Sequence, residues 1–510
     1  MKRLFAVVLS LAMALSLLAG CGDSTSGKAG GSTTGETKST QPAAGGDTKA
    51  AAESQGEVVQ LTLYMASSGN MEDAPLVAEK VNEYIRPLIN AEVTLNYINM
   101  GSYSEQIGLM VRSGEKIDIL YSVENDARNY IRQEAILPLD DLLKSNGEGI
   151  VDQIGADNLE AARVNGSLYS LPSLKDMAMS RMFVYDKAIA DELNLDFSNV
   201  KTLDDLTPIF AQVKEKYPEM SMFGGAGGSA VNFDRWDWDS LSDSMGVLMN
   251  NGQDTEVVNL FATEEYSDIC HLMREWYLAG YIEKDFATSS DTWNGRMKAG
   301  TAFGAITSYK PGAMVSINDQ VGKECGYVVM TEPLAYTSSI VNTNWMIPAS
   351  SENPETAMDF LRLMYTDPVV ANLLINGIEG VHYEENEDGT ISRIDAENCK
   401  YQQYLGWAYG NQFITKVFAG NELDVYDQTR EFNNTAIKSK ALGFSFDNSS
   451  VVNELTACTN VANKYRTSLE CGDVDPDEVL PKFLEELKAA DIDKIMAEKQ
   501  RQLDEWLANK

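Results

Sequence analysis

Histidine and cysteine, the residues most used to bind transition metals, are scarce in this chain. It has two histidines, His271 and His382, and six cysteines among 510 residues. No His-Glu-x-x-His sequence and no Cys-x-x-Cys pair occurs. His271 shares a helical apolar pattern with Met273 and Trp276, which favours a structural role over a catalytic one. We therefore expect no metal site, no cofactor and no catalytic residue.

Basic residues are also in short supply. The chain has 41 lysines and arginines against 76 acidic residues, a formal net charge of −35 at pH 7. Because nucleic-acid binding needs a basic surface, this balance argues against a nucleic-acid partner. The glycine-rich segment 224–229 has no Gly-Lys-Ser/Thr after it, so the pattern does not indicate a nucleotide site either.

The chain begins with a short basic and apolar leader. Lys2 and Arg3 precede an apolar run over 4–18, which is shorter than the roughly 20 residues of a membrane-spanning helix. Small residues follow, then Cys21, so residues 1–20 are interpreted as a signal peptide. The Leu-Ala-Gly-Cys sequence resembles a bacterial lipobox, which would make Cys21 the lipidated first residue. An uncleaved anchor or ordinary secretion is the alternative.

Residues 21–57 are rich in Gly, Ser, Thr, Ala and Gln. Such a composition cannot bury enough apolar surface to fold, so we expect a flexible tether. Beyond it the chain has five cysteines, an odd number, so at least one thiol stays free unless pairing is intermolecular. Cys458 and Cys471 are the closest pair in sequence, and a disulfide between them stays open.

Strand and helix patterns alternate over the first globular part. Strands are expected at 58–65, 92–98 and 117–121, and helices at 75–89 and 104–112. This alternation predicts a parallel α/β sheet, in which ligands sit beyond the carboxyl ends of the strands. Candidate ligand-binding residues at that edge are Ser67, Ser68 and Glu124.

A strand–helix–helix segment spans 339–380. Its strand is expected at 340–347, where β-branched and aromatic residues precede Pro348. Asn353 before Pro354 predicts a helix start, with Asn353 as the cap and proline at the first helical position. Asp367 before Pro368 predicts a second helix start in the same way. Gly377 is a helix stop.

Aromatic and acidic residues gather at 235–239. Aromatic faces can stack on sugars and carboxylates accept hydrogen bonds from hydroxyls, although packing explains large aromatics equally well. A calcium loop on Asp234, Asp237 and Asp239 would lack the usual glycine and terminal glutamate. The candidate ligand-binding residues here and in a later aromatic cluster are Trp236, Asp237, Trp238 and Trp407.

Several segments resemble the family 1 extracellular solute-binding proteins, the sugar receptors of bacterial ABC importers. The most specific is NWMIPASSENPETAMDFLRLMY over 344–365 with GIEGVHYE over 377–384. ILPLDDLL over 136–143 and VNGSLYSLP over 164–172 add to it in the expected order. The resemblance implies that Trp345 faces the ligand and that Trp293 lies close to the cleft.

The resemblance also implies an α/β, two-lobed periplasmic-binding-protein-like fold with a hinge and a ligand cleft between the lobes. Lobe I would comprise 58–172 and 344–378, and lobe II 173–343 and 379–475. Residues 476–510 would form docking helices. The protein would act as a monomer, held by its lipid on the extracellular face of the cell membrane, with the importer's permease subunits as partners.

The expected function is capture of a carbohydrate, in particular an oligosaccharide, without catalysis. One rival is an extracellular glycoside hydrolase, which needs two carboxylates about 5–10 Å apart and shows no recognisable motif here. Another is a receptor for peptides or uronic-acid oligomers. That receptor would want a basic cleft, for which the candidates are Arg181, Arg235, Arg296 and Lys310.

Overall fold

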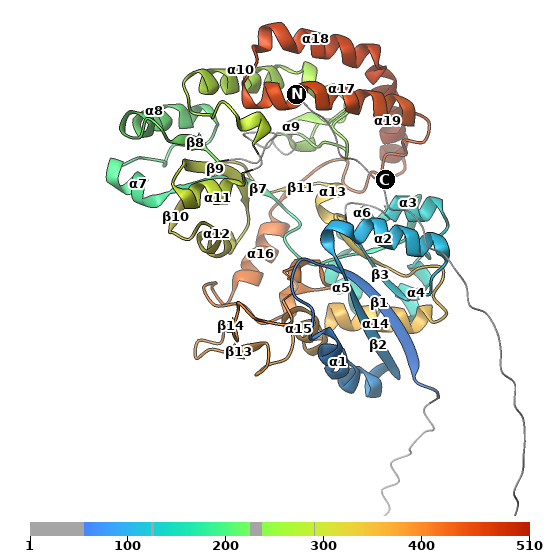
Figure 1. The fold of residues 1–510 in the computed structure, drawn as a ribbon. Helices are drawn as coiled ribbons and strands as arrows, with labels where there is room; N and C mark the ends of the chain where they lie inside the picture. Colours follow the sequence, from blue (N-terminus) through green and yellow to red (C-terminus); the bar gives the residue numbers. More distant parts are fainter. Residues whose placement is uncertain (1–55, 124–126, 225–236, 290, 403) are drawn as a thin grey trace, which may run out of the picture. The chain divides into compact units, whose positions relative to one another are not determined.

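Two open sheets organise the fold, each with its own hydrophobic core (Figure 1). The computed structural model describes residues 56–123, 127–224, 237–289, 291–402 and 404–510. Within these ranges, no helix is both long enough and apolar enough to cross a membrane.

The first sheet has the strand order β2-β1-β3-β12-β6. β1 runs parallel to β2 and β3, as the strand–helix alternation predicts, while β12 is antiparallel to its neighbours β3 and β6. The strands are β1 (Val59–Ser67), β2 (Ala91–Asn99), β3 (Ile119–Val123), β6 (Leu171–Pro172) and β12 (Thr343–Met346).

Helices with apolar stripes cover this sheet. In α1 (Ala74–Ile89), Val77, Val81 and Ile85 recur at one helical face and are fully buried. α14 (Pro354–Thr366) and α15 (Pro368–Asn376) belong to the same core. Asp367 caps α15 as predicted, because its carboxylate accepts hydrogen bonds from two backbone amides at 2.8 and 3.1 Å.

Two local expectations differ from the structure. Asn353 precedes α14 but makes no side-chain cap. The strand expected from residue 340 begins only at Thr343, because α13 (Thr337–Ile340) comes first. Ser339 stabilises that turn by accepting a hydrogen bond from the Tyr336 amide at 3.1 Å.

The second sheet has the order β10-β7-β9-β8. β7 is antiparallel to β9 and β10, and β8 is parallel to β9. Phe183, at the centre of β7, packs against Phe210, Phe223 and Phe303. The strands are β7 (Ser180–Asp186), β8 (Ser221–Phe223), β9 (Ala302–Tyr309) and β10 (Cys325–Val329).

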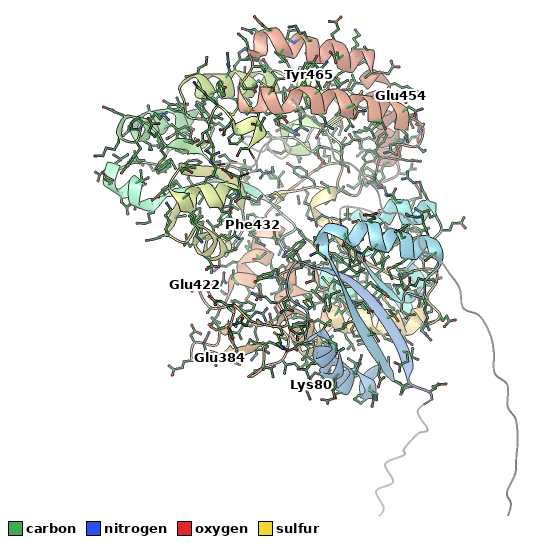
Figure 2. The ribbon with its side chains drawn as sticks, viewed as in Figure 1. Lys80, Glu384, Glu422, Phe432, Glu454 and Tyr465 are labelled. Atoms are coloured by element: carbon green, nitrogen blue, oxygen red, sulfur yellow. The ribbon has the colours of Figure 1, made fainter. Side chains whose placement is uncertain are left out.

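The carboxyl-terminal helices α17 (Val452–Cys471), α18 (Pro476–Ala489) and α19 (Ile492–Ala508) pack onto the second core. Tyr465 of α17, labelled in Figure 2, stacks on Phe483 of α18. Ile495 and Leu503 of α19 are fully buried in the same core. The apolar side of the last helix therefore docks onto the body of its own chain.

The segment 401–409 differs from the expected division into lobes. Tyr401, Leu405 and Tyr409 lie in the first core, whereas the sequence division grouped this segment with the second lobe. Residue order along the chain could not reveal this, because the segment returns to the first sheet after the second is complete.

The five cysteines in the described residues are free. Cys458 and Cys471 lie on one helix, about 20 Å apart along its axis, whereas a disulfide needs Cα atoms within about 7 Å. A disulfide between them is therefore excluded.

The remaining helices are α2 (Met100–Ser113), α3 (Ala127–Arg132), α4 (Asp140–Asn146), α5 (Ile150–Ile154), α6 (Ala156–Ala161), α7 (Lys187–Leu193), α8 (Thr207–Lys216), α9 (Met249–Gly252), α10 (Glu264–Leu278), α11 (Trp293–Ala299), α12 (Ala313–Val321) and α16 (Val425–Asn434). The remaining strands are β4 (Arg163–Val164), β5 (Ser167–Leu168), β11 (Leu334–Ala335), β13 (Tyr383–Glu385), β14 (Ile391–Arg393) and β15 (Ile437–Lys438).

Candidate functional site

The carboxyl end of β1 forms a tight polar turn. The Ser67 side chain is buried and its oxygen accepts a hydrogen bond from the Gly69 amide at 3.2 Å, whereas Ser68 is exposed. A side chain could not replace the hydrogen of Gly69, because a Cβ there would lie 1.7 Å from the Gln402 carbonyl oxygen. Of the two predicted serines, Ser68 is thus the one that can meet a ligand, while Ser67 shapes the turn.

This close approach brings a second segment to the same edge. The same Cβ would lie 2.8 Å from Tyr404, whose side chain is 62% exposed. The Gln402 amide also donates to the Asn70 carbonyl at 2.8 Å. Tyr404 is a candidate ligand-contacting residue that sequence reasoning missed, although its position three residues before Trp407 was an available signal.

Trp407 lies half-buried in a short 3-10 helix, η5 (Gly406–Ala408), at this edge. The Ser173 hydroxyl donates to the Ala408 carbonyl at 2.6 Å, and the Ser173 amide donates to Thr343, where β12 begins. The Lys175 ammonium lies 5.9 Å from the centre of the Trp407 ring. An aromatic surface with a cation beside it is therefore tied to the ligand edge of the first sheet.

The second sheet presents another tryptophan at its corresponding edge. Gly224 follows β8, and a Cβ at that position would lie 2.9 Å from the Trp293 Cα atom. Trp293 is half-buried and opens α11, which Thr292 caps through the Gly295 amide at 3.3 Å. Trp293 thus lies beside the residue that follows β8, and its place close to a ligand cleft stays a prediction.

Trp345 is a core residue, and the expectation that it faces ligand is wrong. Its side chain is fully buried, with ring centroids 5.4 Å from Tyr121 and 5.9 Å from Tyr409. The indole nitrogen donates to the Ala408 carbonyl oxygen at 3.0 Å. Side chains from β3 and from the segment 408–409 therefore cover this ring.

The aromatic and acidic residues at 235–239 differ in their exposure to solvent. Trp238 is 1% exposed in the second core, so its assignment as a ligand residue is also corrected. Asp237 is exposed, while Trp236 and Glu124 lie outside the described residues. In the part of the chain that is described, no group of acidic, histidine or cysteine side chains is arranged to hold a metal ion.

The cations expected for an acidic ligand already have partners. Arg181 is buried and donates to the Ser308 hydroxyl at 3.2 Å, and Arg296 forms an ion pair with Glu283. Lys310 lies 2.8 Å from Asp176. Burial opposes ionisation of Asp176, yet the Lys175 and Lys310 ammonium groups hold the pKa of that carboxyl below its usual value. Arg235 lies outside the described residues.

A hollow of about 840 Å³ lies between α3, the β4–β5 turn and the carboxyl-terminal region. Its charges compensate one another: Arg163 pairs with Asp140 at 2.7 Å, and Arg501 pairs with Glu498 and Glu505 at 2.6 Å each. None of the predicted ligand-binding residues that the structure describes lines this hollow.

Comparison with known proteins identifies the family. Residues 88–378 match the family described as Bacterial extracellular solute-binding protein, and residues 440–508 match a Domain of unknown function (DUF3502). A Carbohydrate ABC transporter substrate-binding protein of Streptococcus pneumoniae serotype 4 (strain ATCC BAA-334 / TIGR4) is 28% identical over 441 residues, which cover 84% of this chain and 87% of the relative. The Polygalacturonan/rhamnogalacturonan-binding protein YtcQ of Bacillus subtilis (strain 168) is 23% identical over 301 residues, 54% of this chain and 58% of the relative.

Solved structures agree on the fold. The N-glycan transport solute binding protein (NgtS) from Streptococcus pneumoniae superposes with a TM-score of 0.80 at 24% identity, covering 88% of this chain and 99% of that chain. The same protein in complex with Man5GlcNAc gives a TM-score of 0.68, also at 24% identity, with 89% and 99% covered. These similarities confirm the two-lobed α/β fold. The chain belongs to the bacterial extracellular solute-binding proteins.

Proposed function

We propose that this protein captures an oligosaccharide outside the cell and delivers it to the permease of an ABC importer. The observation that carries the proposal is the half-buried Trp407 at the ligand edge of the first sheet, with exposed Ser68 and Tyr404 in the same edge region. Aromatic faces and hydroxyls are the groups that bind sugars, and the relative and the solved structure reported above are named for carbohydrate and N-glycan transport.

The proposed cleft lies between two lobes with the sheets as their centres. Lobe I comprises 58–172 and 344–378, to which we add 401–409. Lobe II comprises 173–343, 379–400 and 410–475, with 476–510 docked onto it. The bridges Leu174 to Asn411 and Met179 to Leu334, with the β11–β15 pair, support a hinge where the chain crosses between sheets. Closure about such a hinge would bring Trp293 toward Trp407.

A neutral sugar fits better than a uronic-acid oligomer. The candidate cations Arg181, Arg296 and Lys310 are buried or already paired, so recruiting them for a carboxylate ligand would break existing contacts. A uronic-acid oligomer is still the alternative ligand to test, because YtcQ is named for polygalacturonan binding.

We also propose that the protein performs no catalysis and is anchored through Cys21, with 22–57 as a tether. Membership of a binding-protein family supports the first point. A protein whose role ends with binding should return its sugar intact.

A thermal-shift panel tests the proposal. The panel consists of Man5GlcNAc, maltopentaose, cellopentaose and pentagalacturonate. A ligand at 100 times its Kd stabilises the folded state by about 2.7 kcal/mol, so at least one neutral member should raise the Tm by several degrees and be recovered unchanged on a chromatogram. A shift with pentagalacturonate alone would favour the acidic-ligand alternative, and cleaved products would favour the hydrolase.

A further inference from the structure

A cavity of about 310 Å³ opens beside the first residue of β7. Hydroxyl groups dominate its lining. They come from Ser180, Ser240, Ser242, Ser244, Tyr336 and Ser338. Its volume lies at the small end of the range for ligand pockets, which suits a single sugar ring rather than a whole chain.

The cavity lies at the ligand edge of the second sheet. Ser180 pairs in register with Tyr309, the last residue of β9, and the preceding Met179 amide donates to Leu334 at 2.9 Å in the proposed hinge. Ligands of open α/β sheets bind beyond such strand ends. The cavity therefore lies where the proposed carbohydrate ligand would be expected to bind.

The Ser180 hydroxyl is the observation that points to a ligand. Ser180 is 1% exposed, lines the cavity, and its Oγ has no hydrogen-bond partner. A buried hydroxyl without a partner costs free energy, because it has left water without replacing the hydrogen bonds it made there. Because the Oγ atom itself is buried, a ligand hydroxyl in the cavity would supply the missing partner once the Ser180 side chain turns toward it.

The loop 240–244, which supplies three of the lining serines, has an unfavourable backbone conformation. Leu241, Ser242 and Ser244 have φ of +47°, +82° and +60°, in the left-handed region that residues other than glycine avoid. Such conformations persist only where surrounding contacts impose them. Some of the contacts here are local: the Leu241 amide donates to Asp239 at 3.0 Å and the Ser244 amide to the Ser240 carbonyl at 3.0 Å. Others come from a distant part of the chain.

Lys499 of α19 supplies the distant contacts to this loop. Its side chain is fully buried, and its ammonium group donates to Asp243 at 2.6 Å and to the carbonyl oxygens of Met245 and Gly246 at 3.2 and 3.1 Å. Arg466 of α17 adds its side chain to the cavity lining. Both residues belong to the region 440–508, which matches a domain of unknown function.

We propose that this cavity is a subsite for one neutral, hydroxyl-rich sugar ring and that the carboxyl-terminal region shapes it, with Lys499 as the positioning residue. The inference rests on the proposed carbohydrate function and deepens it. The lining holds one cation, Arg466, and one anion, Asp243, so it favours a neutral group. The region of unknown function thereby becomes part of the ligand site.

Ser180→Ala tests the subsite, with Ser221→Ala as the matched control. Ser221 is equally buried at 1% exposure, on β8 of the same sheet, but its hydroxyl donates to Phe223 at 2.7 Å. Using the neutral panel sugar that wild type binds, calorimetry should show about 5- to 30-fold weaker binding for Ser180→Ala, with an unchanged or higher Tm. Ser221→Ala should lower the Tm and leave the affinity unchanged.

A double-mutant cycle tests the positioning role of Lys499. Lys499→Met should weaken binding by the folded protein. Lys494→Met, also on α19, removes an ion pair with Glu454 of α17 and should not weaken binding. If Lys499 acts through the cavity, Ser180→Ala should have a smaller effect in the Lys499→Met background than in wild type. Additive effects would reduce Lys499 to a purely structural residue.

The outcomes separate the two proposals. Wild type that binds no sugar of the panel overturns both. Wild type that binds a neutral sugar with the same affinity as Ser180→Ala overturns the subsite and leaves the carbohydrate function standing. Wild type that prefers pentagalacturonate overturns the neutral character of the subsite.

Discussion

The indole nitrogen of Trp345 donates a hydrogen bond to the carbonyl oxygen of Ala408 across 3.0 Å. The Ser173 hydroxyl reaches the same oxygen at 2.6 Å. Ala408 directly follows Trp407, so a core tryptophan holds in place the short helix that carries a candidate ligand-contacting one. The family resemblance pointed to Trp345, which lies in the core, and Trp407 beside it stays a candidate ligand-contacting residue.

Trp345→Ala should destabilise the protein by about 3–5 kcal/mol, because it removes a fully buried indole from the first core. Urea denaturation of the free protein measures the loss. A loss below about 1 kcal/mol, combined with weaker sugar binding, would return Trp345 to the ligand site.

Trp407→Ala should weaken sugar binding about tenfold or more while changing the free energy of unfolding much less than Trp345→Ala does. Trp506 of α19 is the matched control, since it is also half-buried with a lysine on its ring, Lys510 at 4.4 Å, but packs against Phe444 of the second core. Calorimetry on both variants should show a loss of affinity for Trp407→Ala alone. Equal affinities would remove Trp407 from the site.

The native thiols should react slowly with iodoacetamide at pH 8. Burial raises the pKa of Cys325, Cys458 and Cys471 to about 11, so about one in a thousand of these groups is the reactive thiolate at that pH. Denatured without reductant, the protein should alkylate at all five cysteines after residue 56, as mass spectrometry would show. Two unmodified cysteines would reveal a disulfide.

Acid should remove one surface contribution to stability. Hydrogen bonds from Arg501 and Gln502 lower the pKa of Glu498 to about 2. Because the folded pKa lies below the unfolded one, this contribution is complete above about pH 4.3 and fades as the pH falls toward 2.

Glu498→Gln should therefore lower stability at pH 7, by at most about 1 kcal/mol because solvent screens the pair, and the gap to wild type should close toward pH 3. Melting curves across this range measure it. Glu485→Gln, on an exposed carboxylate of α18, is the control and should show no such closing gap. A gap that widens toward acid would contradict the ion-pair origin.

Cys21→Ala should release the protein from the membrane fraction or leave its precursor unprocessed. The reason is the position of Cys21 directly behind Leu-Ala-Gly. A lipid on Cys21 would contribute about 0.8 kcal/mol to membrane attachment for each methylene that it buries in the membrane. The substitution removes this whole contribution. Unchanged processing and unchanged membrane retention would rule out the anchor.

Local physics accounts for what the sequence predicted well. The i, i+4 recurrence of Val77, Val81 and Ile85 specifies α1, and the carboxylate of Asp367 specifies the start of α15, because each depends on neighbours within a turn or two. The parallel arrangement of β1 to β3 also follows from the strand–helix alternation along the chain. Family membership was visible for the same reason, since short motifs carry it.

Only the tertiary structure decided which side chains meet solvent at the sheet edges. Trp345 and Trp407 are the same residue type, and one is buried because Tyr121 and the segment 408–409 pack against it from distant parts of the chain. The role of Lys499 in holding a loop at 241–244 was equally invisible, since more than two hundred residues separate the partners. The burial of a side chain depends on contacts from all parts of the chain. A local sequence pattern can therefore predict which residues form a site only where those contacts are also local.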